Sequence, residues 1–278
     1  MTTDPKPAEA GHEAGGPGHG EDIGSTILHH VTDGNTLELP FVGEIHLPQY
    51  RIGGVDLSVT RHVVMMWTAA ALLILFFVLA FRRHDRVSRG FANLLEMLVV
   101  FVRDELAIKN IGEEGKRYTP FLLTAFFFIL TCNLLGLVPY MATATSNMSV
   151  TAGLAILSFL MMQWGGIRSH GVVGYMKSIV PHGVPLYLYP IMVPVEIMGM
   201  LVKPVALCLR LFANMTAGHI VILSLIGLIF VLQTPLVAPV SVGFALFIYL
   251  LELLVAFLQA YIFTMLTSLF IGMAVHSH

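Results

Sequence analysis

The feature that most constrains this sequence is a run of fifty residues between Arg117 and Arg168 that contains no Asp, Glu, Lys or Arg. A helix that crosses the hydrocarbon core of a bilayer needs about 20 apolar residues, so the run is long enough for two spans and a turn. The polar segment 141–147 is the natural place for that turn. The run therefore predicts membrane spans at about 120–140 and 148–167.

The composition of the whole chain agrees with a membrane protein. Only 12% of its 278 residues are charged and 56% are hydrophobic, whereas a soluble globular chain carries roughly 25% charged residues. The net charge of −2 and the lack of a basic cluster argue against a nucleic-acid-binding protein. Cys132 and Cys208 lie in apolar runs without redox or metal-binding spacing, so we expect buried, reduced thiols. A cytosolic enzyme and a disulfide scaffold are excluded.

Three further apolar segments, at about 63–81, 191–231 and 240–275, complete five predicted spans. The last two are some 41 and 36 residues long, which corresponds to helices of about 60 and 54 Å against a hydrocarbon core of about 30 Å. They must tilt, kink or leave the membrane. The segment 91–109 is apolar but too charged to span, and it predicts an amphipathic surface helix. The fold class is an all-α integral membrane protein with a long, strongly tilted C-terminal hairpin.

Charge asymmetry predicts the orientation. The first sixty residues hold nine acidic and two basic residues, whereas four arginines occur within 82–90, so the N-terminus is expected outside and the C-terminus in the cytoplasm. Residues 1–22 are rich in Gly, Pro, Glu and His and predict a disordered acidic tail. Residues 23–278 are expected to form a single membrane domain, beginning with a short helix at 27–31 and irregular chain to 57.

Ionisable groups at bilayer depth are costly and usually functional. In the predicted hairpin they are Glu196, Lys203, Arg210, His219 and Glu252, joined by the uncharged Asn214 and Gln259. The spacing of seven residues places the first three on one helix face, and Asn214 lies one turn from Arg210.

Two pairs in the predicted hairpin agree on one antiparallel register, because residues at equal depth have a nearly constant sum of residue numbers. This register puts Gln259 level with Arg210, and Glu252 level with His219. Arg210 cannot deprotonate and lies too deep to reach the headgroups. Since the chain offers no free carboxylate at that depth, we expect its partner to belong to another subunit.

The remaining polar residues allow more than one interpretation. Lys203 could extend its ammonium group to the headgroups, and Glu196 could be an interfacial carboxylate or line an aqueous inlet. Asn214 and Gln259 could simply hydrogen-bond one helix to the other.

A fixed cation beside a His and Glu pair suggests proton translocation. The alternative is a proton-coupled secondary transporter, which predicts internal repeats that we do not find. The motifs HExxH and GxSxG of proteases and the nucleotide-binding GxxxxGK[ST] are absent from the sequence. We expect no catalytic residue, metal, cofactor or nucleotide contact.

Two stretches of the hairpin resemble a known family. They are KPVALCLRLFANMTAGH at 203–219 and LVAFLQAYIFTMLTSLFIGMA at 254–274, and they resemble subunit a of the F-type ATP synthase membrane sector. NLLGLVPY at 133–140 and TSNMSVTAGLA at 145–155 are weaker matches. The resemblance covers roughly residues 27–275.

The resemblance implies a stator subunit of the bacterial inner membrane that packs against a ring of c-subunits and the b-type peripheral stalk. Arg210 would be the essential arginine between two offset half-channels, with Asn214 and Gln259 beside it. His219 and Glu252 would line the outer half-channel and Glu196 the cytoplasmic one. Many bacterial members carry the acid on the first helix and His on the second, so the pair is exchanged here. The choice of H⁺ or Na⁺ depends on the partner ring, and H⁺ is favoured.

Overall fold

The computed structural model describes residues 36–39, 43–46, 51–52, 55–56, 60–80, 90–138, 143–178, 188–232 and 237–276. Five long helices dominate these residues: α2 (Arg61–Ala80), α5 (Gly115–Gly136), α6 (Met148–Ser178), α7 (Tyr189–Leu232) and α8 (Val237–Val275). All five are long and apolar enough to cross a membrane. The predicted all-α membrane fold with five spans is confirmed. The tail 1–22 and the predicted helix at 27–31 lie outside the described residues.

Two short β-hairpins precede the first span. β1 (Thr36–Leu39) pairs antiparallel with β2 (Gly43–His46), and β3 (Arg51–Ile52) pairs with β4 (Val55–Asp56). The prediction of irregular chain was therefore wrong at these residues. Pairing of the strands satisfies backbone N–H and C=O groups that irregular chain would leave to water.

The predicted surface helix is present as three consecutive helical pieces: α3 (Phe91–Phe101), the π-helical turn η1 (Val102–Ile108) and α4 (Lys109–Ile111). One face is buried in the protein core through residues such as Leu106 and Ile111. The charged side chains lie on the exposed face, where Arg103 and Asp104 form an ion pair of 2.7 Å. The hydrogen bond from Arg103 lowers the pKa of Asp104 below its ordinary value. This segment is amphipathic, as the sequence predicts.

Helix α6 is longer than the span predicted at 148–167. It continues through Arg168 to Ser178, with a break in the helical conformation at Gly171, whose φ is 70°. Glycine adopts positive φ without a steric penalty, so the chain kinks there between two helical stretches. Similarly, α5 begins at Gly115 rather than near residue 120.

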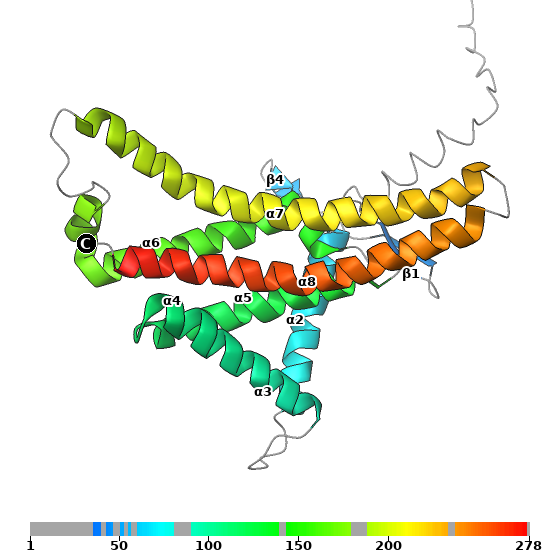
Figure 1. The fold of residues 1–278 in the computed structure, drawn as a ribbon, viewed down its shortest axis with the longest axis horizontal. Coiled ribbons are helices and arrows are strands. Elements are labelled where there is room, and N and C mark those ends of the chain that lie inside the picture. The colour runs from blue at the N-terminus through cyan, green and yellow to red at the C-terminus, as the bar shows by residue number, and fades with distance from the viewer. Residues whose placement is uncertain are drawn as a thin grey trace, which may run out of the picture.

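The hairpin of α7 and α8 extends along the whole molecule, and α2 crosses the other long helices steeply (Figure 1). With 44 and 39 residues, the two helices are about 66 and 58 Å long, far more than the bilayer core. The predicted long hairpin is confirmed. α7 also diverges from α8 toward its N-terminal end (Figure 1).

The core lies where α5, α6 and α8 meet η1, and its largest fully buried side chains include Phe126 and Phe263. Two hydrogen bonds fix the C-terminal end of α8 to this bundle. Ser169 donates to the carbonyl oxygen of Val275 (3.0 Å), and His276 donates to that of Ile111 (2.8 Å). The ends of α4, α6 and α8 that the sequence assigns to one side of the membrane therefore meet at one end of the molecule.

Candidate functional site

The predicted pair on the two hairpin helices lies in direct proximity. Nε2 of His219 is 3.8 Å from Oε1 of Glu252, so the predicted facing of these residues is confirmed. Glu252 is 4% exposed, and neither of its carboxylate oxygens has a hydrogen-bond partner within the described part of the chain. Gly218 makes room for this carboxylate, because a Cβ there would lie 2.7 Å from Oε1.

The second predicted pair is shifted by one helical turn. Nδ2 of Asn214 donates to Oε1 of Gln259 at 2.8 Å, whereas the sequence placed Gln259 level with Arg210. Gln259 is buried on α8 and Asn214 is exposed on α7. This hydrogen bond between the side-chain amides fixes the orientation of Gln259. Arg210 therefore does not have Gln259 as its partner.

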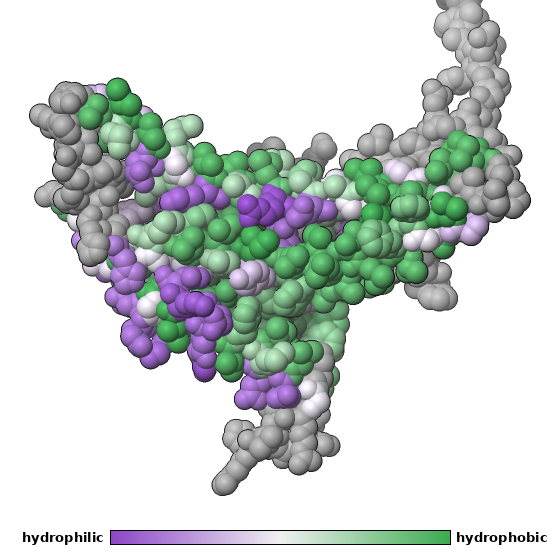
Figure 2. All heavy atoms as spheres, in the orientation of Figure 1, coloured by the Kyte–Doolittle hydropathy of each residue, from purple (hydrophilic) through white to green (hydrophobic). Residues whose placement is uncertain are grey.

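Arg210 lies on the exposed surface of α7. Within the described residues its guanidinium forms no hydrogen bond and no ion pair. Figure 2 shows hydrophilic side chains in the middle of α7, on a surface that is otherwise mostly hydrophobic. A guanidinium has five N–H donors and keeps its charge, so this position in a spanning helix requires a partner from outside the described chain.

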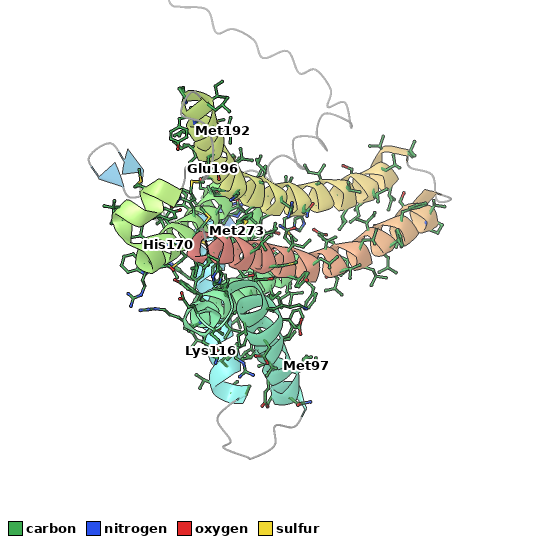
Figure 3. The ribbon with its side chains drawn as sticks, turned by 60° about the vertical axis from the view of Figure 1, so that its left-hand side comes forward. Met97, Lys116, His170, Met192, Glu196 and Met273 are labelled. Atoms are coloured by element: carbon green, nitrogen blue, oxygen red, sulfur yellow. The ribbon has the colours of Figure 1, made fainter. Side chains whose placement is uncertain are left out.

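The structure gives Lys203 a contact that the sequence did not indicate. Its Nζ lies 5.3 Å from the centroid of the Phe270 ring on α8, within the range of a cation–π interaction. Glu196 is exposed on the N-terminal part of α7 that diverges from the bundle (Figure 3). These two residues therefore lie apart from the His219 and Glu252 contact.

Two residues at the site were missed by sequence reasoning. Thr143 is hydrogen-bonded through Oγ1 to Nε2 of His219, and its carbonyl oxygen accepts a hydrogen bond of 3.0 Å from Nδ1 of His62. The sequence predicted a polar turn at 141–147, and the structure buries Thr143 and Thr145 of this turn. The threonine-rich, charge-free composition of this turn was the available signal.

A second buried polar group lies close to α8. Thr145 donates to Oδ1 of Asn133 at 2.7 Å, and Nδ2 of Asn133 donates to the carbonyl oxygen of Ala256 at 3.3 Å. These bonds join the turn after α5 to the middle of α8. The Asn133 side chain is therefore held by hydrogen bonds on two sides, in contrast to the Glu252 carboxylate.

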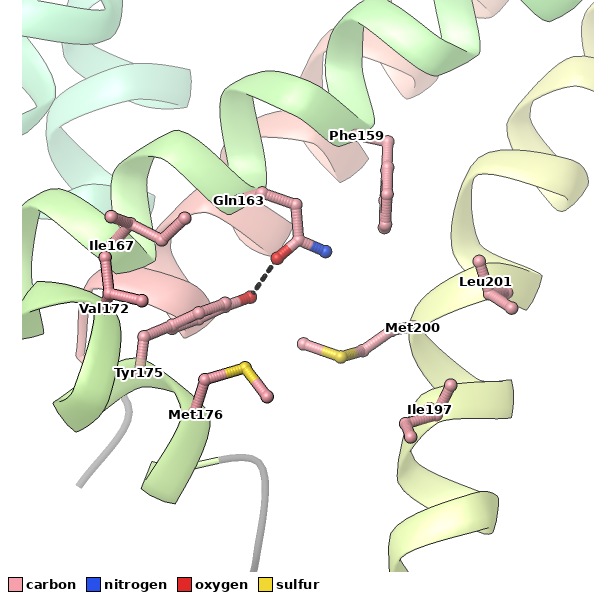
Figure 4. A pocket seen from close by; sticks show the side chains of 9 residues that line it. All are labelled: Phe159, Gln163, Ile167, Val172, Tyr175, Met176, Ile197, Met200 and Leu201. Carbon is pink, nitrogen blue, oxygen red and sulfur yellow. Dashed lines mark hydrogen bonds between the residues drawn. The ribbon is translucent and has the colours of Figure 1, made fainter.

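A cavity of about 340 Å³ lies between α6 and the N-terminal part of α7 (Figure 4). Its lining is mostly apolar, and its main polar feature is a 2.5 Å hydrogen bond from the Tyr175 hydroxyl to Oε1 of Gln163. No group of three or more metal-ligating side chains occurs in the described ranges. Cys132 and Cys208 are buried and free, as expected.

The fold and the site define a class: a polytopic membrane protein that keeps ionisable side chains at the depth of its spanning helices. The family model of the ATP synthase A chain matches residues 63–272. The chain therefore belongs to this family.

Similar proteins cover most of the chain. ATP synthase subunit a of Chloroherpeton thalassium is 57% identical over 253 residues, which are 89% of this chain and 76% of that protein. ATP synthase subunit a of Anaeromyxobacter dehalogenans is 50% identical over 97% of this chain and 74% of its own length. ATP synthase subunit a 2 of Prosthecochloris aestuarii is 51% identical over 96% of this chain and 85% of its own length.

Proposed function

We propose that this protein is the stator subunit of the ATP synthase membrane sector and carries protons through two offset half-channels to a rotating ring. The names of its relatives support membership of the complex. The observation that carries the proposal is Arg210, which is exposed on a spanning helix and unpaired within the described chain. A permanent charge in this position is stabilised when a partner brings a carboxylate to it.

The proposal requires that each subunit of the ring carries a carboxylate at the depth of Arg210, and this rotor carboxylate must alternate between two states. It is neutral while it faces lipid, because an ionised group there is costly, and ionised while it passes Arg210. The guanidinium attracts the ionised form and repels protons, so a proton cannot pass directly from one half-channel to the other. Asn214, which is exposed and hydrogen-bonded to the buried Gln259, provides a neutral polar group beside the arginine.

The outer half-channel is assigned to His219 and Glu252, which are close enough for proton exchange after a small movement. Glu196, exposed near the N-terminal end of α7, is assigned to the cytoplasmic half-channel. One proton that crosses a potential of 100 mV releases about 2.3 kcal/mol, so several protons are required for each ATP made elsewhere in the complex.

The surroundings of the subunit follow from this assignment. The chain spans the bacterial inner membrane with its N-terminus outside and its C-terminus in the cytoplasm. The Arg210 face of α7 contacts the c-subunit ring, and other surfaces contact b-type stalk subunits. Nucleotide chemistry belongs to other subunits.

The test replaces Arg210 with Ala in the intact ATP synthase and measures ATP-driven proton pumping in inverted membrane vesicles. We expect pumping to be abolished while the complex assembles normally, because the rotor carboxylate loses its only fixed counter-charge. Arg103→Ala, which removes an exposed arginine paired on the surface helix, is the control and should pump normally. Normal pumping by Arg210→Ala would refute the proposal.

A further inference from the structure

We infer that Thr143 is a positioning residue for His219, whose hydroxyl holds the imidazole beside Glu252 in both protonation states of the ring. The inference rests on the proposed function, because it assigns a role within the outer half-channel. It is carried by the contacts that converge on Thr143 from four segments of the chain.

The first contact concerns a single nitrogen atom. Nε2 of His219 is hydrogen-bonded to Oγ1 of Thr143, and the same Nε2 is the atom that lies 3.8 Å from Oε1 of Glu252. The separation from Glu252 is too long for a hydrogen bond. Thr143 is therefore the residue that fixes where Nε2 points.

The chemistry of a hydroxyl suits this position. A threonine hydroxyl both donates and accepts, whereas an imidazole nitrogen accepts when bare and donates when it carries a proton. Thr143 can donate to the bare Nε2 and accept from the protonated Nε2. The ring thus keeps the same partner before and after it exchanges a proton with Glu252. Because Nε2 has a single lone pair or a single hydrogen, this hydrogen bond must open during the exchange itself.

Thr143 is itself held from two sides. Its carbonyl oxygen accepts hydrogen bonds from Nδ1 of His62 (3.0 Å) and from the Ser146 hydroxyl (2.8 Å). Since a carbonyl oxygen cannot donate, Nδ1 of His62 must carry a hydrogen. His62 is 2% exposed and Thr143 is 3% exposed, so the hydrogen bond between them does not compete with bulk water.

Gly136 at the end of α5 supplies the space for the threonine side chain. A Cβ on Gly136 would lie 2.2 Å from Oγ1 and 2.7 Å from Cβ of Thr143. No side chain at position 136 is compatible with this placement of Thr143. The first turn of α2, the end of α5 and the η2 turn (Ala144–Ser146) thereby set the orientation of a residue on α7.

The test compares Thr143→Val with Thr143→Ser in the intact complex, with pumping rates normalised to the amount of assembled enzyme. Valine keeps the shape and removes the hydroxyl, and serine keeps the hydroxyl. We expect Thr143→Val to reduce ATP-driven pumping at least fivefold and Thr143→Ser to stay within twofold of wild type. Thr124→Val is the matched control, because the Thr124 hydroxyl bonds only within α5, to the Pro120 carbonyl, on an exposed face.

A double variant separates positioning from packing. In a His219→Ala background, Thr143→Val should cause no further loss, because the partner of the hydroxyl is gone. Pumping by Thr143→Val within twofold of wild type, an equal loss in Thr143→Ser, or additive losses in the double variant would each overturn the inference.

Two further comparisons keep the test decisive. If Thr143→Val does not assemble, His62→Asn, which retains an N–H donor for the Thr143 carbonyl, should pump faster than His62→Leu, and equal rates would reject the inference. Arg210→Ala is measured in parallel. Pumping by Arg210→Ala would reject the proposed function, whereas an inactive Arg210→Ala with a normal Thr143→Val would reject the positioning role alone.

Discussion

At the scale of single residues, Glu252 and Arg210 differ in how the membrane-spanning part of the chain accommodates their charge. Glu252 is buried between α7 and α8 and can become neutral by binding a proton. Arg210 has no such route, and it lies on the surface of α7. The chain therefore buries the group whose charge is adjustable and exposes the group whose charge is permanent.

Gly218→Ala tests the space beside Glu252. The added Cβ would lie 2.7 Å from Oε1 and 2.9 Å from Cδ of Glu252, so the carboxylate must move away from His219. We expect a loss of pumping of at least threefold, although alanine favours the helix by about 1 kcal/mol. Gly199→Ala on the same helix meets nothing within 4 Å and should pump like wild type. Equal rates for the two variants would contradict the placement of Glu252.

At the scale of elements, the hairpin of α7 and α8 aligns its polar residues. The His219 and Glu252 contact and the Asn214 to Gln259 hydrogen bond occur about two turns apart along α8. Both are compatible with one antiparallel packing of the helices. The packing of the two helices thus sets the spacing between Arg210 and the His219 and Glu252 pair.

Cysteine pairs test this register of α7 against α8. Cysteines at His219 and Glu252 should be joined by a short bifunctional thiol reagent, because the native side chains approach to 3.8 Å. The pair at His219 and Gln259 is about 10 Å out of register along the helix axis and should react poorly. Crosslinks are measured as a mobility shift on gels after a proteolytic cut between the helices. Equal yields from both pairs would show that the register is wrong.

At the scale of the whole molecule, α7 and α8 expose a large hydrophobic surface, including Leu209, Phe244 and Leu250. Lipid covers such a surface, but lipid tails cannot satisfy Arg210. The proposed function therefore places a protein partner with a carboxylate at matching depth against the surface around Arg210.

A photo-crosslinking residue at Ala213 tests this surface. Ala213 is exposed and lies about one turn from Arg210, so we expect capture of a small membrane protein that is present in many copies. The control position is Leu79, 55% exposed on α2, which should not capture that protein. Mass spectrometry identifies the product, and capture of lipid alone at Ala213 would contradict the expected rotor contact.

The order of residues alone is enough to predict the five spans, the surface helix, the long hairpin and the isolation of Arg210. These properties depend on the partition of each segment between water and lipid, which is local to the segment. The strand pairing before α2 was missed although Thr36–Leu39 alternates polar and apolar residues, because strands of two to four residues are too short for a period of two to be distinguished.

The contacts between polar groups that are distant along the chain could not be predicted, and they become visible only in the folded protein. His62 and Thr143 are 81 positions apart, and Thr143 and His219 are 76 apart, so their contacts depend on how the turn after α5 folds inward. Gln259 pairs with Asn214 rather than lying level with Arg210, and Lys203 approaches Phe270. Both contacts likewise depend on how the helices are rotated about their axes. A hydrogen bond requires a position within a few tenths of an ångström, and hydropathy along a chain carries no such information.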